Sequence, residues 1–324
     1  MITYEKLSRR PSAFKSLTGM DLLAFDRLFE AFVPAHSQRL STTPTKRGGQ
    51  PRKRAYGGGP RFSHELRDRL VMALVWLKVY PTKVYPTYEV LGFFFSLAKP
   101  NARFNIEEIL DTLEALAEFT LERPTKDRKK LRTVEAVMDA FPEVRLVIDS
   151  KEQRIRRPSG RDEDGTSLQR RYYSGKKKAH TLKTQIAVRP DGLIEAVSDS
   201  PPGSTHDLTL LRQTKLLERL ETDEGAMMDK GYDGIEKDHP ASPLYLPYKA
   251  RRNRPLTDIE EAYNQELSSY RIVVEHTNTQ LQNFGVLAQT YRHAREKHSR
   301  TFRAVAGRVN RQIGVTPLIT YGAE

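Results

Sequence analysis

The stretch HTLKTQIAVRPDGLIEAVSDSPPG (residues 180–203) decides the fold class. Apolar and polar side chains alternate on both sides of Pro190-Asp191-Gly192, which is typical of two strands joined by a tight turn. A β-branched run, VRLVIDS (residues 144–150), precedes this hairpin and predicts a strand that ends at Asp149. The sequence therefore predicts that a sheet begins near residue 140.

Helical and extended segments alternate after the hairpin. The apolar spacing in residues 208–220 predicts a helix, and GAMMD (residues 225–229) predicts a short strand that ends at Asp229. Residues 268–284 predict a long helix that contains Glu275, and residues 292–314 a basic helix that either packs on the domain or contacts phosphate. This order indicates an α/β domain with a mixed sheet flanked by helices.

The N-terminal part of the chain is predicted to be all helical. Residues 12–34 form one helix that stops before Pro34, and Ser63 caps a second helix. Short helices over residues 87–96 and from residue 99 or 100 onward are joined by a tight turn, as in helix-turn-helix domains, although small helical domains of other function share this pattern. The reading helix would present Lys99, Asn101, Arg103 and Asn105.

A basic segment rich in glycine and proline separates the helices. KRGGQPRKRAYGGGPR (residues 46–61) contains no acidic residue, and Arg52, Lys53 and Arg54 stand at its centre. Such a segment is either flexible with basic side chains that bind phosphate, or a solvated hinge without ordered contacts. We therefore expect four parts: a helical segment (1–34), a linker (35–62), a helix-turn-helix region (63–135) and an α/β domain (136–324).

Composition limits the kinds of chemistry that the chain can perform. The 324 residues include no cysteine, which excludes disulfides, thiolate catalysis and cysteine-ligated zinc. The formal charge of +13 favours a polyanionic partner, nucleic acid above all. No apolar run reaches the length of a membrane span, and the N-terminus has no signal-peptide pattern. We expect a cytoplasmic protein that is associated with the nucleoid through DNA, with no membrane partner.

Three acidic residues occupy positions suited to a metal site. Asp149 and Asp229 follow predicted strands and Glu275 lies in a predicted helix, so a sheet edge can gather them. Clustered carboxylates repel one another unless a cation lies among them, and hard oxygen ligands select Mg²⁺ or Mn²⁺. Each acid alone is also explained as a turn, cap or solvated residue, so spacing leaves both interpretations open.

Four motifs in order resemble one known family. They are IDS (148–150), SGKKKAHTLKTQIAVRPDGLIEAVSDSPPGSTHD (174–207), DKGYDG (229–234) and YRIVVEHTNTQLQNFGVL (270–287). Together they are similar to the DDE-superfamily transposases of bacterial insertion sequences, in the branch related to eukaryotic Harbinger elements. The resemblance covers about residues 140–312, and residues 17–34 and 63–118 resemble the helix-turn-helix region of that family. It implies a ribonuclease-H-like fold.

The resemblance also implies roles for individual residues. Asp149, Asp229 and Glu275 would form a catalytic triad that holds two Mg²⁺ ions, with Mn²⁺ able to substitute. Asp207 would be a further ligand or a residue that caps or positions the helix after it. The other supporting residues would be His206, Lys230 and Arg271, and the DNA approach would be lined by Lys176, Lys177, Lys178, His180 and Lys183. Related branches also have a tyrosine three residues before the arginine, where this chain has Ser268, with Tyr270 nearby.

The function implied by the resemblance is DNA transposition. The helical region would bind terminal inverted repeats, and the triad would hydrolyse a phosphodiester to free a 3′-hydroxyl that attacks target DNA. Two ends require at least a homodimer in the synaptic complex. The alternatives are a DNA-binding protein whose chemistry has lapsed, and a histidine-aspartate phosphohydrolase, which the strand position of His180 disfavours because those sites lie on helices.

Overall fold

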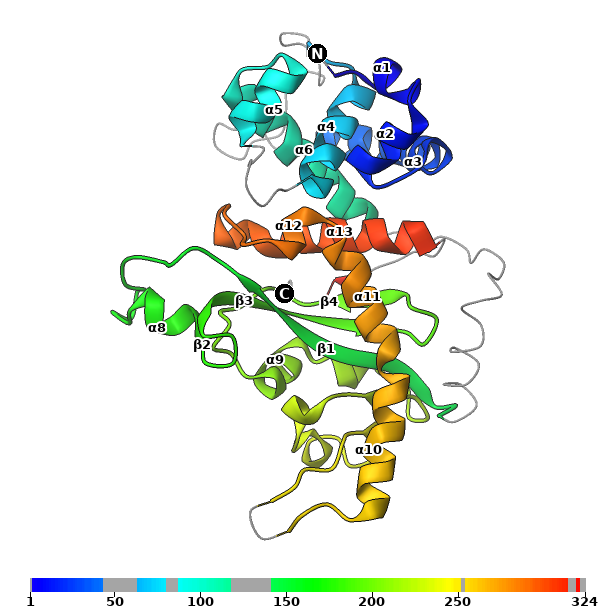
Figure 1. Cartoon of the computed structure of the whole chain (residues 1–324), viewed down its shortest axis with the longest axis vertical. Helices are drawn as coiled ribbons and strands as arrows, with labels where there is room; N and C mark the ends of the chain where they lie inside the picture. The colour runs from blue at the N-terminus through cyan, green and yellow to red at the C-terminus, as the bar shows by residue number, and fades with distance from the viewer. Residues whose placement is uncertain are drawn as a thin grey trace. The chain divides into compact units, whose positions relative to one another are not determined.

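The structure is a computed structural model that describes residues 2–42, 63–79, 87–117, 141–251, 254–313 and 319–320. The chain forms two compact units, shown with the rest of the chain in Figure 1. The first contains residues 1–119 and 283–289, and the second contains residues 120–282 and 290–324. None of the described helices is both long and apolar enough to cross a membrane.

The first unit is helical in its described residues and is built around one buried helix. Its elements are α1 (Tyr4–Ser8), α2 (Pro11–Thr18), α3 (Leu22–Thr42), α4 (Leu66–Lys78), α5 (Tyr88–Phe95), α6 (Lys99–Ala117) and α12 (Gly285–Ala288). Every residue of α4 from Arg69 to Leu77 is buried, so neighbouring helices cover it on all sides. The late segment that contains α12 packs against α4, where the Lys78 ammonium donates to the carbonyl of Asn283 at 2.8 Å.

The predicted helix over residues 12–34 is two helices. Gly19 ends α2 in the left-handed region, at φ +78°, where glycine carries no Cβ penalty. The next helix, α3, continues through Pro34 to Thr42, so the prediction that it stops before Pro34 is wrong. Proline removes one backbone hydrogen bond, but Phe32 and Leu40 on either side are buried in the core and hold the helix together.

Two further boundaries in the first unit need comment. The N-cap of α4 is Glu65 and not Ser63, whose hydroxyl lies 3.1 Å from the His64 ring. The predicted linker over residues 35–62 loses its first part to α3, and its remainder, with Arg52, Lys53 and Arg54, lies outside the described residues.

The two helices of the predicted helix-turn-helix pair are present. Thr87 caps α5 by accepting a hydrogen bond from the amide of Val90, and Ser96 ends α5 in the left-handed region at φ +53°. Helix α6 begins three residues later, at Lys99. The short connection was predicted from the sequence, whereas DNA reading by α6 stays a prediction.

The second unit is a mixed sheet with helices on both faces (Figure 1). Its strands are β1 (Val144–Arg154), β2 (Tyr173–Ser174), β3 (Ala179–Val188), β4 (Ile194–Val197), β5 (Gly225–Met227), β6 (Leu244–Tyr245) and β7 (Ile319–Thr320). The strand order among described residues is β6-β5-β1-β3-β4-β7, and β2 pairs with the start of β3. The pairs β1–β3 and β3–β4 are antiparallel, whereas β1–β5, β5–β6 and β4–β7 are parallel. The predicted α/β class is confirmed.

Strand β1 is longer than its apolar run predicted. It pairs with β3 from Val147 to Arg154, so Asp149 lies within the strand. The prediction that the strand ends at Asp149 is therefore wrong. The parallel neighbour β5 pairs with β1 only as far as Val147 and Met227. Among the described residues, β1 therefore pairs with a strand on one side only from Asp149 to Gln153, and its other edge is available there to form a site.

The two faces of the sheet are covered by different helices. They are α8 (Leu168–Tyr172), α9 (Asp207–Thr214), α10 (Asp258–Tyr270), α11 (Ile272–Gln282) and α13 (His298–Ile313). Leu146 and Ile148 pack with Leu211 of α9 on one face. Helices α11 and α13 cover the other, where the buried His298 ring bonds Gln153 of β1. Helix α13 therefore packs on the sheet, one of the two alternatives for residues 292–314, and begins only at His298; phosphate contact stays a prediction.

The predicted helix over residues 268–284 is also two helices. Helix α10 begins at Asp258 with a capping box, in which Thr257 and Glu260 exchange hydrogen bonds between side chain and backbone. Arg271 separates α10 from α11, and α11 ends at Gln282, where the chain passes into the first unit. The Thr-Asp-Ile-Glu sequence at residues 257–260 signals this helix start, ten residues before the predicted one at residue 268.

Candidate active site

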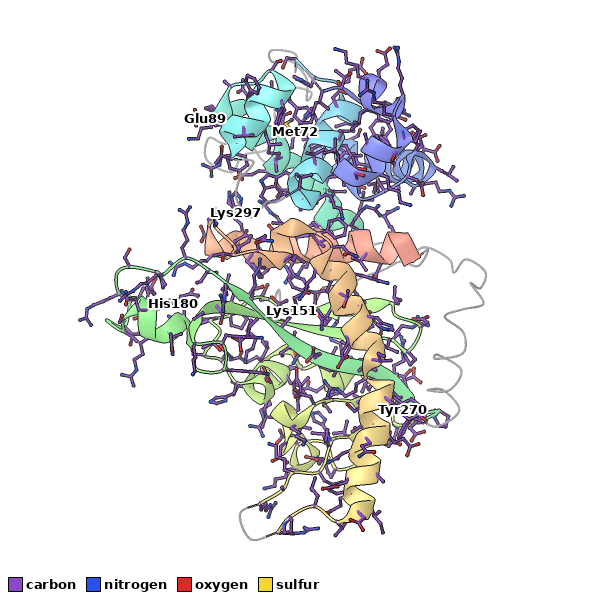
Figure 2. The ribbon with its side chains drawn as sticks, viewed as in Figure 1. Met72, Glu89, Lys151, His180, Tyr270 and Lys297 are labelled. Carbon is purple, nitrogen blue, oxygen red and sulfur yellow. The ribbon has the colours of Figure 1, made fainter. Side chains whose placement is uncertain are left out.

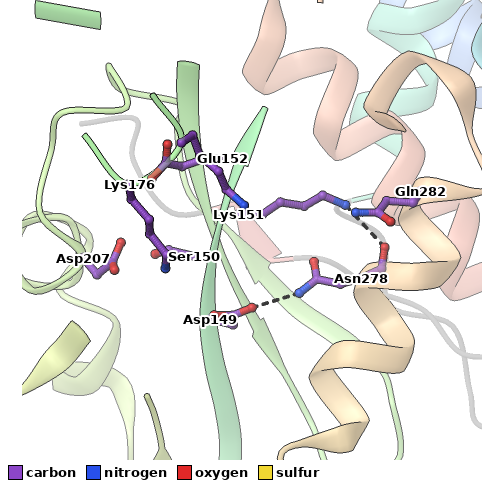
Figure 3. Close-up of a pocket in the computed structure, with 9 residues that line it drawn as sticks. Asp149, Ser150, Lys151, Glu152, Lys176, Asp207, Asn278 and Gln282 are labelled. Atoms are coloured by element: carbon purple, nitrogen blue, oxygen red, sulfur yellow. Dashed lines mark hydrogen bonds between the residues drawn. The ribbon is translucent and has the colours of Figure 1, made fainter. Parts of the chain in front are cut away.

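A polar pocket lies along the free edge of β1 (Figure 3). Side chains from both faces of the sheet line this pocket, because neighbouring residues of a strand point to opposite sides. Four consecutive β1 residues line it, together with the turn before β3, the start of α9 and the end of α11. The lining residues are Asp149, Ser150, Lys151, Glu152, Lys176, Lys177, Asp207, Asn278 and Gln282.

Asp149 is held in the pocket by α11. The Asn278 side-chain amide donates to Asp149 Oδ2 at 2.9 Å (Figure 3). Burial raises the pKa of Asp149, the positive charge of Arg271 opposes this rise, and the negative charge of Asp229 adds to it. The two aspartates that were selected from the sequence therefore lie close enough to interact electrostatically.

Sheet register explains why Asp229 comes near Asp149. Val147 and Met227 are paired neighbours on parallel strands, and each aspartate follows its paired residue by two positions. Beyond β5 the chain turns into a 3₁₀ turn, η2 (Lys230–Tyr232), and the Asp229 carboxylate caps it by accepting from the amide of Gly231 at 2.6 Å. Asp229 is thus fixed at the point where β1 and β5 diverge.

Gly231 lies between Asp229 and a third carboxylate, that of Asp207. A Cβ atom at this position would lie 2.8 Å from Asp229 Oδ1 and 2.7 Å from Asp207 Oδ2. Real Cβ atoms do not approach oxygen so closely, so only glycine allows both carboxylates their positions. The DKGYDG motif therefore requires a glycine here for space, since Gly231 does not have a positive φ.

Tyr232 anchors the turn that carries Asp229. Its side chain is fully buried, and its hydroxyl lies 2.7 Å from Ser150 Oγ on β1 and accepts from the Gln185 amide on β3 at 3.0 Å. Burial raises the pKa of the phenol, so it stays neutral and can donate to Ser150 while it accepts from Gln185.

Lys183 is buried and paired with carboxylates, which corrects its predicted role on the DNA-facing surface. Its ammonium lies 2.8 Å from Asp207 Oδ1 and 3.8 Å from Glu152 Oε1, and it donates to the carbonyl of Thr205 at 2.6 Å. A buried cation with these partners holds the start of α9 against the sheet. Lys183 is therefore a structural residue of the site in this structure.

Asp207 is not the helix cap. The N-cap of α9 is the exposed His206, which makes no side-chain capping bond, and Asp207 is the first helical residue. A carboxylate in the first helical turn is favourable, and its ion pair with Lys183 fixes its direction. The alternative that Asp207 is a positioning residue agrees with these contacts.

Glu275 is exposed on α11. It stands four residues after Arg271 and three before Asn278, so the three share one helix face by spacing. In the part of the chain that the structure describes, no group of three acidic or histidine side chains is arranged to hold a metal ion. Asp149 and Asp229 interact electrostatically, and Asp207 and Asp229 lie on either side of Gly231.

The predicted lysines before β3 flank the pocket. Lys176, Lys177 and Lys178 are exposed in the turn between β2 and β3, and the first two line the pocket. Figure 2 labels His180 on the nearby part of β3, where its ring packs edge-on against Tyr173. Lys230 is exposed beside Asp229. All these side chains except the half-buried His180 are open to a polyanion.

The residues selected in the first unit differ in their exposure. Lys99, Asn101 and Arg103 are exposed, with Lys99 3.6 Å from Glu89 and Arg103 2.9 Å from Glu107. Asn105 is only 5% exposed, accepts a hydrogen bond from buried Arg69 and donates to the carbonyl of Asn101. The prediction that Asn105 reads DNA is therefore wrong for this structure, because its side chain is occupied inside the helical core.

A family comparison connects this geometry with known proteins. The family model described as DDE superfamily endonuclease matches residues 148–310, which is half of the chain and includes the aspartates, Gly231 and α11. The chain belongs to this family.

Two curated relatives of this DDE endonuclease are insertion-sequence transposases. A probable transposase for insertion sequence element IS702 from Microchaete diplosiphon is 27% identical over 268 residues, covering 82% of this chain and 87% of the relative. A transposase for insertion sequence element IS1106 from Neisseria meningitidis serogroup B is 37% identical over 99 residues, covering 29% and 31%. These relatives support the resemblance to insertion-sequence transposases found from the motifs.

Two solved structures are also similar to the DDE endonuclease chain. A Mos1 transposase paired-end complex with left transposon end is 11% identical and covers 78% of this chain and 72% of that chain, with a TM-score of 0.21. A pre-cleavage Mos1 transpososome is 8% identical and covers 82% of both chains, with a TM-score of 0.20. Scores this low support no statement about the fold.

The aspartates of this DDE endonuclease suit a divalent cation. Asp149 and Asp229 supply hard oxygen donors at one strand edge, and their mutual repulsion helps to raise the pKa of Asp149. A divalent cation near both would remove that repulsion. The exposed Glu275 shares a helix face with Asn278, the residue that holds Asp149.

Proposed function

We propose that this DDE endonuclease is an insertion-sequence transposase. The helical unit binds the terminal inverted repeats of its element, and the α/β unit, with a ribonuclease-H-like arrangement, cleaves DNA and transfers the 3′ end to target DNA. The observation that carries the proposal is the register of β1 and β5, which brings Asp149 and Asp229 together at the free strand edge. Membership of the endonuclease family supports it.

Asp149, Asp229 and Glu275 are the proposed catalytic residues and the ligands of two Mg²⁺ ions, for which Mn²⁺ can substitute. Bound Mg²⁺ supplies an activated water or hydroxyl and stabilises the leaving oxygen of the phosphodiester. The chain's own contacts orient the ligands, because Asn278 fixes Asp149 and the amide of Gly231 fixes Asp229. Arg271 balances their negative charge.

Basic residues around the pocket are the proposed DNA contacts of the catalytic unit. Lys176 and Lys177 line the pocket, and Lys178, Lys230 and His206 are exposed around it. Exposed ammonium groups bind phosphate through counterion release, so binding should weaken with salt. Because two transposon ends must be joined, the active complex is proposed to be a homodimer on DNA.

A second candidate function rests on the finding that the described residues contain no group of three acidic or histidine side chains arranged to hold a metal ion. A protein that keeps both aspartates but has lost a working third ligand would bind the same DNA without cutting it. This lapsed, sequence-specific DNA-binding protein shares the fold and the basic surface with a transposase, so DNA binding does not separate the two functions. Cleavage does.

The decisive experiment is cleavage of a labelled duplex that carries the element's own terminal repeat, in Mg²⁺, Mn²⁺ or chelator. The wild-type chain is compared with Asp229→Ala and Glu275→Ala, and with Asp223→Ala as a matched control. Asp223 is an exposed aspartate near the opposite end of β5 and has no place in the proposed site.

We expect metal-dependent nicking at the repeat boundary that Asp229→Ala and Glu275→Ala abolish and Asp223→Ala retains, with DNA binding unchanged in all. Binding without nicking in any metal would replace the transposase proposal by the lapsed function. Normal nicking by Glu275→Ala would remove Glu275 from the catalytic residues and leave the endonuclease proposal standing.

A further inference from the structure

A lysine that the sequence analysis did not select lies beside Asp149. Lys151 follows it by two residues in β1, so both side chains leave the same face of the strand. Figure 2 labels Lys151 on this strand, and Figure 3 shows its side chain extending toward α11. Its ammonium donates to the backbone carbonyl of Asn278 at 3.3 Å.

Asn278 holds both charged residues in a fixed relation. Its side-chain amide bonds the carboxylate of Asp149, and its backbone carbonyl bonds the ammonium of Lys151. One residue of α11 therefore sets the direction of an anion and of a cation that line the same pocket. This arrangement places the ammonium of Lys151 beside any ligand that binds at the carboxylate of Asp149.

The charge of Lys151 is compensated only in part, because the carboxylate of Asp149 attracts it without forming an ion pair. Its half-buried ammonium has three donors, and in the described part of the chain it has no carboxylate within ion-pair distance, only the neutral carbonyl. Lys183, at the same end of the sheet, is by contrast paired with both Asp207 and Glu152. Partial burial of an ammonium without an anion is unfavourable, so the site around Lys151 favours an anionic ligand.

We propose that Lys151 binds a non-bridging oxygen of the DNA phosphate that is cleaved at Asp149. The inference rests on the proposed function and adds a substrate-binding residue to it. A lysine ammonium is a compact point charge that suits a phosphate oxygen. Lys176 and Lys177 line the same pocket, and their exposed side chains can guide the DNA backbone toward it. Lys151 then contacts the scissile phosphate itself.

The test is a double-mutant cycle read by DNA binding in chelator, where no cleavage occurs. The terminal-repeat duplex is used with either a normal phosphate or an uncharged methylphosphonate at the cleavage position. For the wild-type chain, the neutral linkage should weaken binding roughly ten- to a hundredfold, the range for a hydrogen bond between charged groups. Lys151→Gln should bind the normal duplex correspondingly weakly and lose little more on the methylphosphonate.

The control variant is Lys237→Gln, which removes an exposed lysine of the same unit outside the pocket and should keep the full methylphosphonate penalty. If thermal unfolding shows that Lys151→Gln does not fold, Lys151→Met replaces it, because methionine keeps an aliphatic stem and lacks the charged ammonium.

Equal methylphosphonate penalties in the wild type and the Lys151 variant would overturn the assignment of Lys151. Cleavage by the wild type in metal would still support the transposase function in that case. A chain that does not bind the terminal-repeat duplex at all would refute the proposed function, and the inference about Lys151 with it.

Discussion

Replacing Tyr232 by phenylalanine should loosen the turn that carries Asp229. The substitution removes one oxygen atom and with it the contacts to Ser150 at 2.7 Å and to Gln185 at 3.0 Å. Ser150 is half-buried and lines the pocket, so water can replace its lost partner, whereas Gln185 is buried and its amide loses a partner that water cannot replace. One unsatisfied buried donor costs about 1–3 kcal/mol, so we expect the free energy of unfolding to fall by about 2 kcal/mol.

The cleavage rate should fall as well, because the turn positions Asp229 relative to Asp149. A loss of about 1.4 kcal/mol in transition-state stabilisation corresponds to roughly a tenfold slower reaction. The assay measures single-turnover cleavage well below the melting temperature, alongside chemical denaturation. Tyr291→Phe is the matched control, since Tyr291 is also buried and its hydroxyl lies 3.3 Å from Thr301, away from the pocket. Equal cleavage rates for the two variants, or full stability of Tyr232→Phe, would refute the positioning role.

Two further substitutions test the carboxylates. Burial raises the pKa of Asp149, so between the usual aspartate pKa and the raised one the folded state binds more protons than the unfolded state, and stability falls as pH rises. Asp149→Asn should therefore stabilise the metal-free protein at pH 7 but not at about pH 3, as measured by denaturation at both pH values. Cleavage should be lost. A variant that is no more stable than the wild type at pH 7 would contradict this prediction. Gly231→Ala should slow cleavage at least tenfold, roughly the effect of 1.4 kcal/mol, because the new Cβ displaces Asp207 and Asp229. Gly175→Ala is the control and should cleave normally, because a Cβ at that position meets no atom within 4 Å. Equal cleavage rates for the two variants would show that the space at Gly231 is unimportant.

The sheet could be predicted from the sequence because its signals are local. The hairpin of β3 and β4 follows from alternation around Asp191-Gly192, and Gly192 has the positive φ of +86° that such a turn requires. The lengths of the strands and helices were harder to predict from the sequence. Strand β1 continues past Asp149 because β3 pairs with it, and α3 continues past Pro34 because buried apolar side chains hold it, and neither cause is visible in the segment itself.

The site was predicted in part for the same reason. Asp149 and Asp229 were selected from their places after strands, and the register of the strands brings them together. Lys183 and Asn105 were assigned to a DNA surface because their residue types suit phosphate and bases. Their burial depends on Asp207 and on Arg69, which come from distant parts of the chain. Residue type alone cannot reveal such partners.

The passage of the chain between the two units has a practical consequence for dividing the protein. Residues 283–289 belong to the helical unit, although the residues before and after them belong to the sheet unit. A fragment that ends at residue 119 would lack Phe284, Val286 and Leu287, which are buried in the intact chain, and would leave the side of α4 that they cover open to water. Exchanging the helical unit between related proteins therefore needs three crossovers, after residues 119, 282 and 289, and the second falls directly after α11, the helix that holds Asp149.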